Sequence, residues 1–109
     1  MDTTYRFKAL FKKYRLKAEI STLSEFGHVL AEKGFIYEDS IFSHWQKGSR
    51  VPQNRVILLK IIEIFVERGA ITALAQANEF LASAKQGYLS QEELQKIPIK
   101  LNTQIFQVP

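Results

Sequence analysis

Four polar side chains that lie close together in the sequence could form hydrogen bonds with the edges of nucleic-acid bases. They are Asp39, Ser40, Ser43 and His44. A serine hydroxyl both donates and accepts, so it suits either type of base pair, and a carboxylate can accept from the N4 amino group of cytosine. Their spacing places them on the outward side of a short helix, which is the element that fits into the major groove of DNA.

Side chains that could hold phosphate groups flank this segment. Residues 1–17 carry six cationic side chains against one carboxylate, whereas the charges of residues 70–109 sum to zero and the whole chain carries +4. A run of like charge is most often a solvated helix face, so this distribution does not identify a ligand by itself. Contacts to phosphate would add affinity and fix the register of the domain on the duplex. The candidate phosphate-binding residues are Lys12, Lys13, Lys17, Thr22, Lys47, Ser49 and Arg50.

The periodicity of the apolar residues predicts the helices that must position these groups. We expect five helices over residues 4–16, 22–33, 39–47, 54–68 and 72–84, with a short sixth over residues 90–96. Thr22 with Glu25, and Ser90 with Glu93, have the spacing of capping boxes. Glycines that follow the periodic segments are predicted to end four of the helices. These are Gly34, Gly48, Gly69 and Gly87.

The apolar stripes of these helices predict one core. The predicted inward residues of the first three helices are Phe7, Leu10, Phe11, Tyr14, Phe26, Val29, Leu30, Ile41, Phe42 and Trp45. Those of the next two are Val56, Leu59, Ile61 or Ile62, Phe65 or Val66, Leu74, Ala77, Phe80, Leu81 and Ala84. The sequence therefore predicts an all-α bundle that forms a single domain over residues 1–97, followed by an extended tail or linker over residues 98–109.

The segment over residues 22–59 resembles the helix-turn-helix domain of bacterial and phage repressors of the XRE type, which contains five helices. The recognition helix and the loop after it carry the resemblance. The residues that match at the same spacing are Ser40, Ser43, Trp45, Gly48, Arg50, Val51 and Pro52. The resemblance implies sequence-specific binding to double-stranded DNA, with the helix over residues 39–47 in the major groove. It also implies a role in transcription, and a small module of this kind would gain affinity as a homodimer.

Two features depart from the pattern of that family. The connector over residues 32–37 is longer by several residues, which leaves the angle between the two motif helices open. Glu38 and Asp39 begin the recognition helix, where carboxylates would be repelled by phosphate. Either these two residues stabilise the start of the helix through its dipole, or Asp39 reads a base.

The segment over residues 71–94 is similar to the part that follows such a domain in bacterial signalling NTPases of the STAND class. This resemblance implies that the chain is the N-terminal piece of a larger regulator, because no phosphate-binding glycine loop occurs in its 109 residues. It also supports an alternative function, in which the helix-turn-helix fold serves as a protein-interaction module in front of an NTPase.

Other classes of function find little support in the residues. The chain has no cysteine and two histidines, His28 and His44, without the spaced partners that a metal site needs. No nucleophile and base are paired in a recognisable pattern, so we expect neither an enzyme nor a cofactor nor a small-molecule substrate. No apolar stretch is long enough to cross a bilayer and no secretory signal is visible, so we expect a cytoplasmic protein.

Overall fold

The computed structural model describes residues 3–97, and the regular secondary structure in this part of the chain is all α-helix. The six helices are α1 (Thr3–Lys17), α2 (Leu23–Glu32), α3 (Asp39–Lys47), α4 (Arg55–Glu67), α5 (Leu74–Ser83) and α6 (Gln91–Lys96). The predicted all-α bundle of five helices and a short sixth is therefore confirmed. The predicted tail over residues 98–109 lies outside the described residues.

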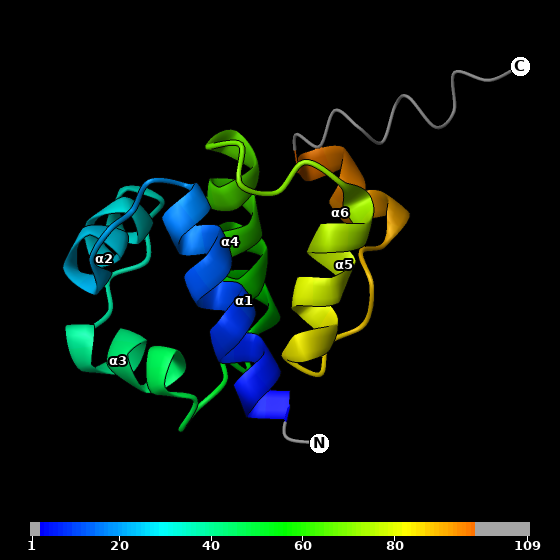
Figure 1. Ribbon diagram of the computed structural model, residues 1–109. Helices are drawn as coiled ribbons and strands as arrows, with labels where there is room; N and C mark the ends of the chain where they lie inside the picture. Colours follow the sequence, from blue (N-terminus) through cyan, green and yellow to red (C-terminus); the bar gives the residue numbers. More distant parts are fainter. Residues whose placement is uncertain (1–2, 98–109) are drawn as a thin grey trace, which may run out of the picture.

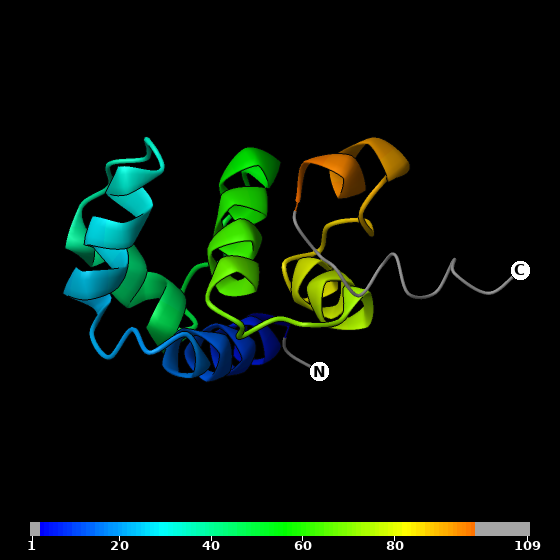
Figure 2. The same cartoon turned by 90° about the horizontal axis from the view of Figure 1, so that it is seen from above.

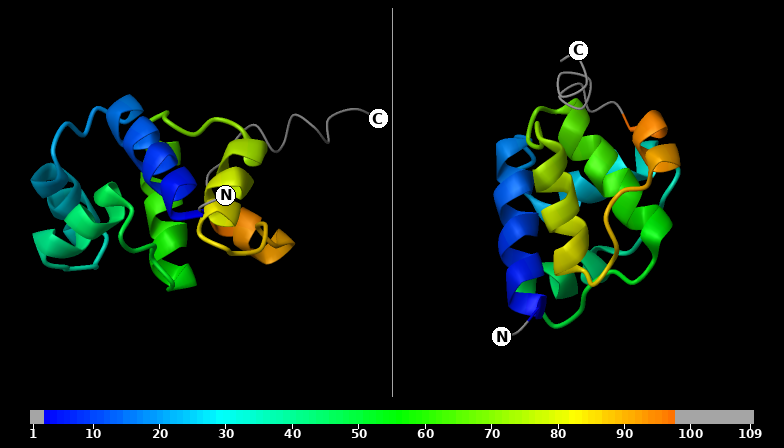
Figure 3. Two further views of the ribbon diagram at one scale, coloured as in Figure 1. Left: turned by 60° about the horizontal axis from the view of Figure 1, so that its bottom comes forward. Right: turned by 90° about the vertical axis from the view of Figure 1, so that its right-hand side faces the viewer.

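Helix α4 stands in the middle of the bundle. Seen from above, α2 and α3 lie on one side of it and α5 and α6 on the other, while α1 runs along a third side (Figure 2). Helix α1 packs against both α3 and α5, and α2 packs against α3 and α4. The side-by-side arrangement of α1 and α5 is visible in the right-hand view of Figure 3. Helix α1 thus joins the two halves of the bundle.

An aromatic cluster fills the centre of the core. Phe11 contacts Phe26 edge-on, with ring centroids 5.1 Å apart, and Phe65 contacts Phe80 in the same way at 5.8 Å. Such edge-to-face pairs add stabilisation beyond the burial of their area. The predicted stripe of α1 is confirmed, because Phe7, Leu10, Phe11 and Tyr14 are all buried. The core therefore draws side chains from α1, α2, α3, α4 and α5, whereas α6 contributes none.

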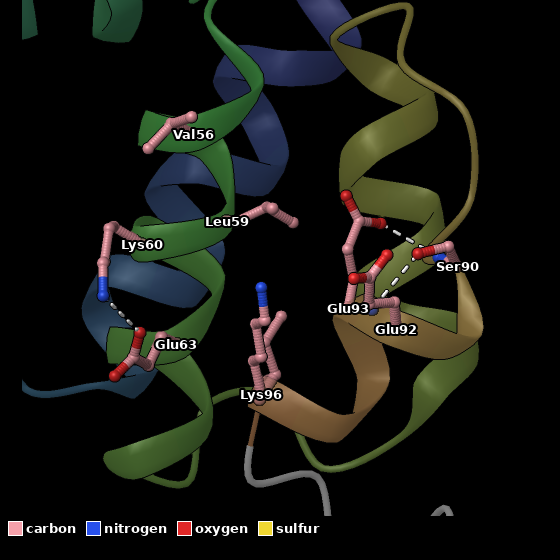
Figure 4. A pocket seen from close by; sticks show the side chains of 9 residues that line it. Val56, Leu59, Lys60, Glu63, Ser90, Glu92, Glu93 and Lys96 are labelled. Carbon is pink, nitrogen blue, oxygen red and sulfur yellow. Dashed lines mark hydrogen bonds and ion pairs between the residues drawn. The ribbon is translucent and has the colours of Figure 1, made fainter.

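The buried face of α4 differs from the prediction at its start. Val56 is 56% exposed and Leu59 is only partly buried, whereas Ile57 and Leu58 are buried together with Ile61, Ile62, Ile64 and Phe65. The helix is apolar around most of its circumference, so several phases of its stripe were equally good in the sequence. Packing of the neighbouring helices selected one of them and left Val56 at the edge of the cavity between α4 and α6 (Figure 4).

The helix ends agree with the prediction except after α5. Gly34, Gly48 and Gly69 adopt left-handed backbone conformations just beyond α2, α3 and α4. After α5, however, the left-handed residue is Lys85, with φ of 63°, and Gly87 has no positive φ. The amide of Lys85 donates to the carbonyl of Ala82, so the turn that closes α5 comes two residues before the predicted glycine.

The C-terminal segment is held to α4 by one arginine. Arg55 donates to both carboxylate oxygens of Glu93 at 2.8 Å and also to the carbonyls of Gly87 and Tyr88. Glu93 completes the predicted capping box with Ser90 as well. The hydrogen bonds from Arg55 are the main reason that the pKa of Glu93 falls to about 2. The sequence indicated the capping role of Glu93 but not its ion pair.

Candidate nucleic-acid interface

Helix α3 has one buried face and one polar face, as predicted. Phe42 and Trp45 are buried, while Asp39 and Ser40 are exposed and Ser43 is half-buried. At about 100° of rotation per residue, Asp39, Ser40 and Ser43 fall within an arc of about 100°, roughly opposite the buried stripe. The same arc contains Lys47 in the last turn, which is exposed. The structure therefore brings three of the four predicted base-reading residues together on one outward face.

The back of α3 is fixed to α1 by a buried arginine. Arg15 is 6% exposed and donates to the carbonyls of Ile20 and Ser21 at 2.9 and 2.8 Å. It also donates to the side-chain oxygen of Gln46, whose amide donates to the carbonyl of Lys8. Burial lowers the pKa of the Arg15 guanidinium from its ordinary value. Arg15 belongs to the basic N-terminal run of the sequence, yet its charge holds α1, α3 and the loop between α1 and α2 together.

The fourth predicted base-reading residue, His44, is turned toward the loop after α3. Its Nδ1 atom lies 2.9 Å from the hydroxyl oxygen of Ser49, within hydrogen-bonding distance. The amides of Gly48, Ser49 and Arg50 all donate to the carbonyl of His44. Because these amides already have an acceptor, a phosphate at this loop would be held by side chains rather than by the backbone. Lys47, Ser49 and Arg50 are the exposed side chains there.

Lys17 and Thr22 lie at the two ends of the loop between α1 and α2. The hydroxyl oxygen of Thr22 accepts from the amide of Glu25 at 3.0 Å, as predicted, but the carboxylate of Glu25 accepts from the amide of Ser21 rather than from Thr22. The Thr22 hydroxyl keeps its own proton free to donate to an anion. Lys17 is the last residue of α1, at the end of the bundle away from the loop between α3 and α4 (Figure 1). The two groups of candidate phosphate ligands are thus well apart.

Lys12 and Lys13 lie on the exposed side of α1. The Nζ atom of Lys13 lies 5.4 Å from the centroid of the Tyr14 ring, a cation–π arrangement. Among the described residues, neither lysine contacts any of the other candidate phosphate-binding residues. Their exposure is equally compatible with a solvated helix face.

The charge along α3 changes sign from one end to the other. Glu38 and Asp39 are exposed at its start, and Lys47 and Arg50 are exposed at and beyond its end. Glu38 is the N-cap residue, but its side chain makes no capping hydrogen bond. The carboxylates of Glu38 and Asp39 can still stabilise the start of α3 by interacting with the helix dipole. Because Asp39 is exposed, its carboxylate is also accessible to a base edge.

The structure adds one cation that the sequence did not indicate. Lys85, which follows α5, lines the same cavity as Ser49 and Arg50. The two segments are far apart in the sequence, and both lie at the lower end of the bundle in Figure 1. The charges of residues 70–109 sum to zero, so nothing in the sequence singled out this lysine.

A second cavity, of about 540 Å³, lies between α4 and α6 and contains none of the predicted site residues (Figure 4). Its lining includes Leu59, Ile97 and Lys96, and the Lys60–Glu63 ion pair lies on its α4 wall. Within residues 3–97, no three His, Cys, Asp or Glu side chains gather in a way that could hold a metal ion. In the same part of the chain, none of the helices combines the length and the apolar character needed to cross a bilayer.

Comparison of the chain with protein-family models, with curated proteins and with solved structures finds no match. Function is therefore inferred from the residues and geometry of this chain.

Proposed function

We propose that this chain is a helix-turn-helix domain of the XRE repressor type that binds double-stranded DNA sequence-specifically, as a transcriptional regulator or as the DNA-binding module of a larger one. The observation that carries the proposal is the division of α3. Its Phe42 and Trp45 side is buried, and its Asp39, Ser40 and Ser43 side is polar and accessible. A short helix of this kind can enter the major groove and offer hydrogen bonds to base edges.

Two groups of side chains would hold the phosphates on either side of that groove. Lys47, Ser49 and Arg50 lie at and beyond the end of α3, and Lys17 and Thr22 lie at the two ends of the loop between α1 and α2. Arginine and lysine neutralise phosphate and release counterions, which gives binding a steep dependence on salt. Base contacts by Ser40 and Ser43 would add the dependence on sequence.

The first experiment is fluorescence anisotropy with a random-sequence duplex pool at 50 and 200 mM salt, followed by selection of the bound duplexes. We expect affinity to fall with salt and a short motif to be enriched. Arg50→Glu should abolish binding, and Lys96→Glu is the matched control. Lys96 is an exposed lysine of α6, on the other side of α4 from α3, and its reversal changes the net charge equally (Figures 2 and 4). Equal losses from both reversals, with far-UV circular dichroism unchanged, would contradict a specific role for Arg50.

The same selection tests the oligomeric state. A domain of this size would bury little surface as a monomer on DNA, so we propose a homodimer on two half-sites about 10 base pairs apart, or a multiple of that spacing. The enriched motif should then be an inverted repeat, and the stoichiometry of the complex in sedimentation should be two chains per duplex. If one chain binds a single half-site, the proposed homodimer is wrong, but the proposed binding to DNA is not contradicted.

The acidic start of α3 favours a second function, a protein-interaction module in front of a signalling NTPase. Glu38 and Asp39 are exposed there, and Ile36 in the preceding connector is 85% exposed. An exposed apolar side chain beside like charges is more typical of a protein contact than of a phosphate contact. Negligible binding of DNA at 50 mM salt, by a chain whose circular dichroism shows an intact bundle, would favour this second function.

A further inference from the structure

A cavity of about 370 Å³ lies between the loop that joins α3 to α4 and the C-terminal end of α5. Both segments are at the lower end of the bundle in Figure 1, close to the end of α3. Its lining residues are Ser49, Arg50, Val51, Gln53, Ser83, Ala84 and Lys85. The cavity therefore adjoins one of the two proposed phosphate-binding groups and extends it with residues from the other half of the chain.

The charges in this cavity are both positive. Arg50 and Lys85 are exposed, and neither forms an ion pair with a carboxylate of residues 3–97. By contrast, Arg6, Lys33, Arg55 and Lys60 are each paired with a glutamate. No acidic residue lines the cavity, and the hydroxyl of Ser83 already donates to the carbonyl of Phe80 at 2.6 Å. Two unneutralised cations at one concave surface favour an anion there.

The backbone at Lys85 gives a second, independent observation. Its φ of 63° lies in the left-handed region, which disfavours any residue with a Cβ atom. The ends of α2, α3 and α4 use glycine for their left-handed residue, and only the ends of α1 and α5, among the described helices, use Glu19 and Lys85 instead. A strained residue that could be replaced by glycine suggests that its side chain has a use.

We propose that Arg50 and Lys85 together bind one phosphodiester group of the DNA backbone. This inference rests on the proposed function and adds to it a contact from beyond the helix-turn-helix segment. The planar guanidinium of Arg50 can bind a phosphate through two parallel hydrogen bonds, and the ammonium of Lys85 approaches it as a point charge. The hydroxyl of Ser49 lines the same cavity but already donates to the carbonyl of His44, so the two cations are the groups that would hold the phosphate.

The test compares Lys85→Ala and Lys85→Gly with Lys96→Ala as the control for loss of one exposed lysine. Neutralising one phosphate contact should reduce the slope of log K against log salt by about 0.9 and lower affinity about fivefold to tenfold at 0.1 M salt. Lys85→Gly should also raise the thermal midpoint, because glycine relieves the left-handed strain. A residue with a purely structural role would not lose DNA affinity while the fold becomes more stable.

The double variant Arg50→Ala with Lys85→Ala tests whether both residues hold the same phosphate. If they do, the loss of affinity in the double variant should be smaller than the product of the two single losses. Lys85 variants that match wild type in slope, while Arg50→Glu abolishes binding, would overturn this inference and leave the proposed function intact. Absence of DNA binding by the wild-type chain would instead overturn the proposed function, and this inference with it.

Discussion

The ring of Phe42 in α3 lies directly against the backbone of Gly27 in α2. A Cβ atom placed at Gly27 would come within 3.1 Å of the Cε2 atom of Phe42 and 3.4 Å of a carboxylate oxygen of Asp39. Contacts of 3.1 Å are tighter than ordinary van der Waals separations, so the two helices approach as closely as a glycine permits. The position of the polar face of α3 therefore depends on the absence of a side chain at Gly27.

We expect Gly27→Val to destabilise the fold by about 1–3 kcal/mol, because Phe42 is fully buried and has little room to move. Urea unfolding followed by circular dichroism measures this change. Gly87→Ala is the control, since a Cβ atom there meets nothing within 4 Å and no positive φ is required. The control should be neutral or stabilising by about 0.4–1 kcal/mol. An equal loss in both variants would exclude the close approach as the cause.

Arg15 should prove to be a structural residue rather than a DNA ligand. Arg15→Met removes the donors for the buried carbonyl of Ile20 and the partly buried carbonyl of Ser21, so we expect a loss of about 2–4 kcal/mol in the free energy of unfolding. Lys17→Met, at an exposed position two residues later, should change stability by no more than about 0.5 kcal/mol. Denaturant unfolding of the two variants in parallel measures their free energies of unfolding. Similar values would contradict a structural role for the buried side chain of Arg15.

The Arg55–Glu93 pair should make stability depend on acid. The hydrogen bonds from Arg55 hold the pKa of Glu93 at about 2, below its ordinary value of 4.5. A carboxylate whose pKa is depressed on folding stabilises the fold fully above the unfolded pKa and loses this contribution as the pH falls through the folded pKa. Glu93→Gln should therefore lower the free energy of unfolding by about 2 kcal/mol at neutral pH and by almost nothing near pH 2. The loss at neutral pH is smaller than the full pKa shift implies, because the ion pair is partly exposed to solvent.

Urea titrations of the wild type and Glu93→Gln between pH 7 and pH 2 test this prediction. Glutamine can still occupy the third position of a capping box, so the substitution removes mainly the charge. Glu92→Gln, at the exposed neighbouring position, is the control for the loss of one glutamate charge from α6. A stability difference between wild type and Glu93→Gln that stays constant down to pH 2 would exclude the ion pair as its source.

If α3 binds in the major groove, substitution of Ser43 should change the sequence preference of DNA binding, whereas substitution of Lys47 should change only its affinity. Ser43→Ala should relax the preference at one position of the enriched motif by about 1–3 kcal/mol, because a base edge loses its partner. Lys47→Ala should weaken binding to all sequences alike and reduce the salt slope by about 1. Competition binding with single-position variants of the motif separates the two effects. Loss of sequence preference in Lys47→Ala instead would contradict the assigned roles.

Sequence periodicity was sufficient for the helices and for most of the core. The bounds of α3 agree with the prediction, and the other helices differ from it by one or two residues at their ends. Apolar spacing works here because α1, α2 and α3 each have a single narrow apolar stripe. The prediction from apolar spacing was wrong for Val56, because α4 is apolar on nearly all sides and the helices packed against it decide which face is buried.

The candidate site was predictable only in its local part. Asp39, Ser43 and Arg50 lie on α3 and in the loop that follows it, which Gly48 and Pro52 mark in the sequence, so their grouping follows from local geometry. Arg50 and Lys85 line one cavity although they are 35 positions apart in the sequence, and no local pattern encodes that arrangement.

The sequence by itself determined the secondary structure, the apolar stripes of α1, α2 and α3 and the polar face of α3, because each depends on the spacing of residues a few positions apart. The tertiary structure decided where the charged side chains lie and which groups they contact. Arg15 of α1 became buried against α3, Arg55 became the anchor of α6, and Lys85 came to line the same cavity as Arg50. The physical reason is that a charge acts on whatever packing brings near it, and only the folded chain fixes those distances.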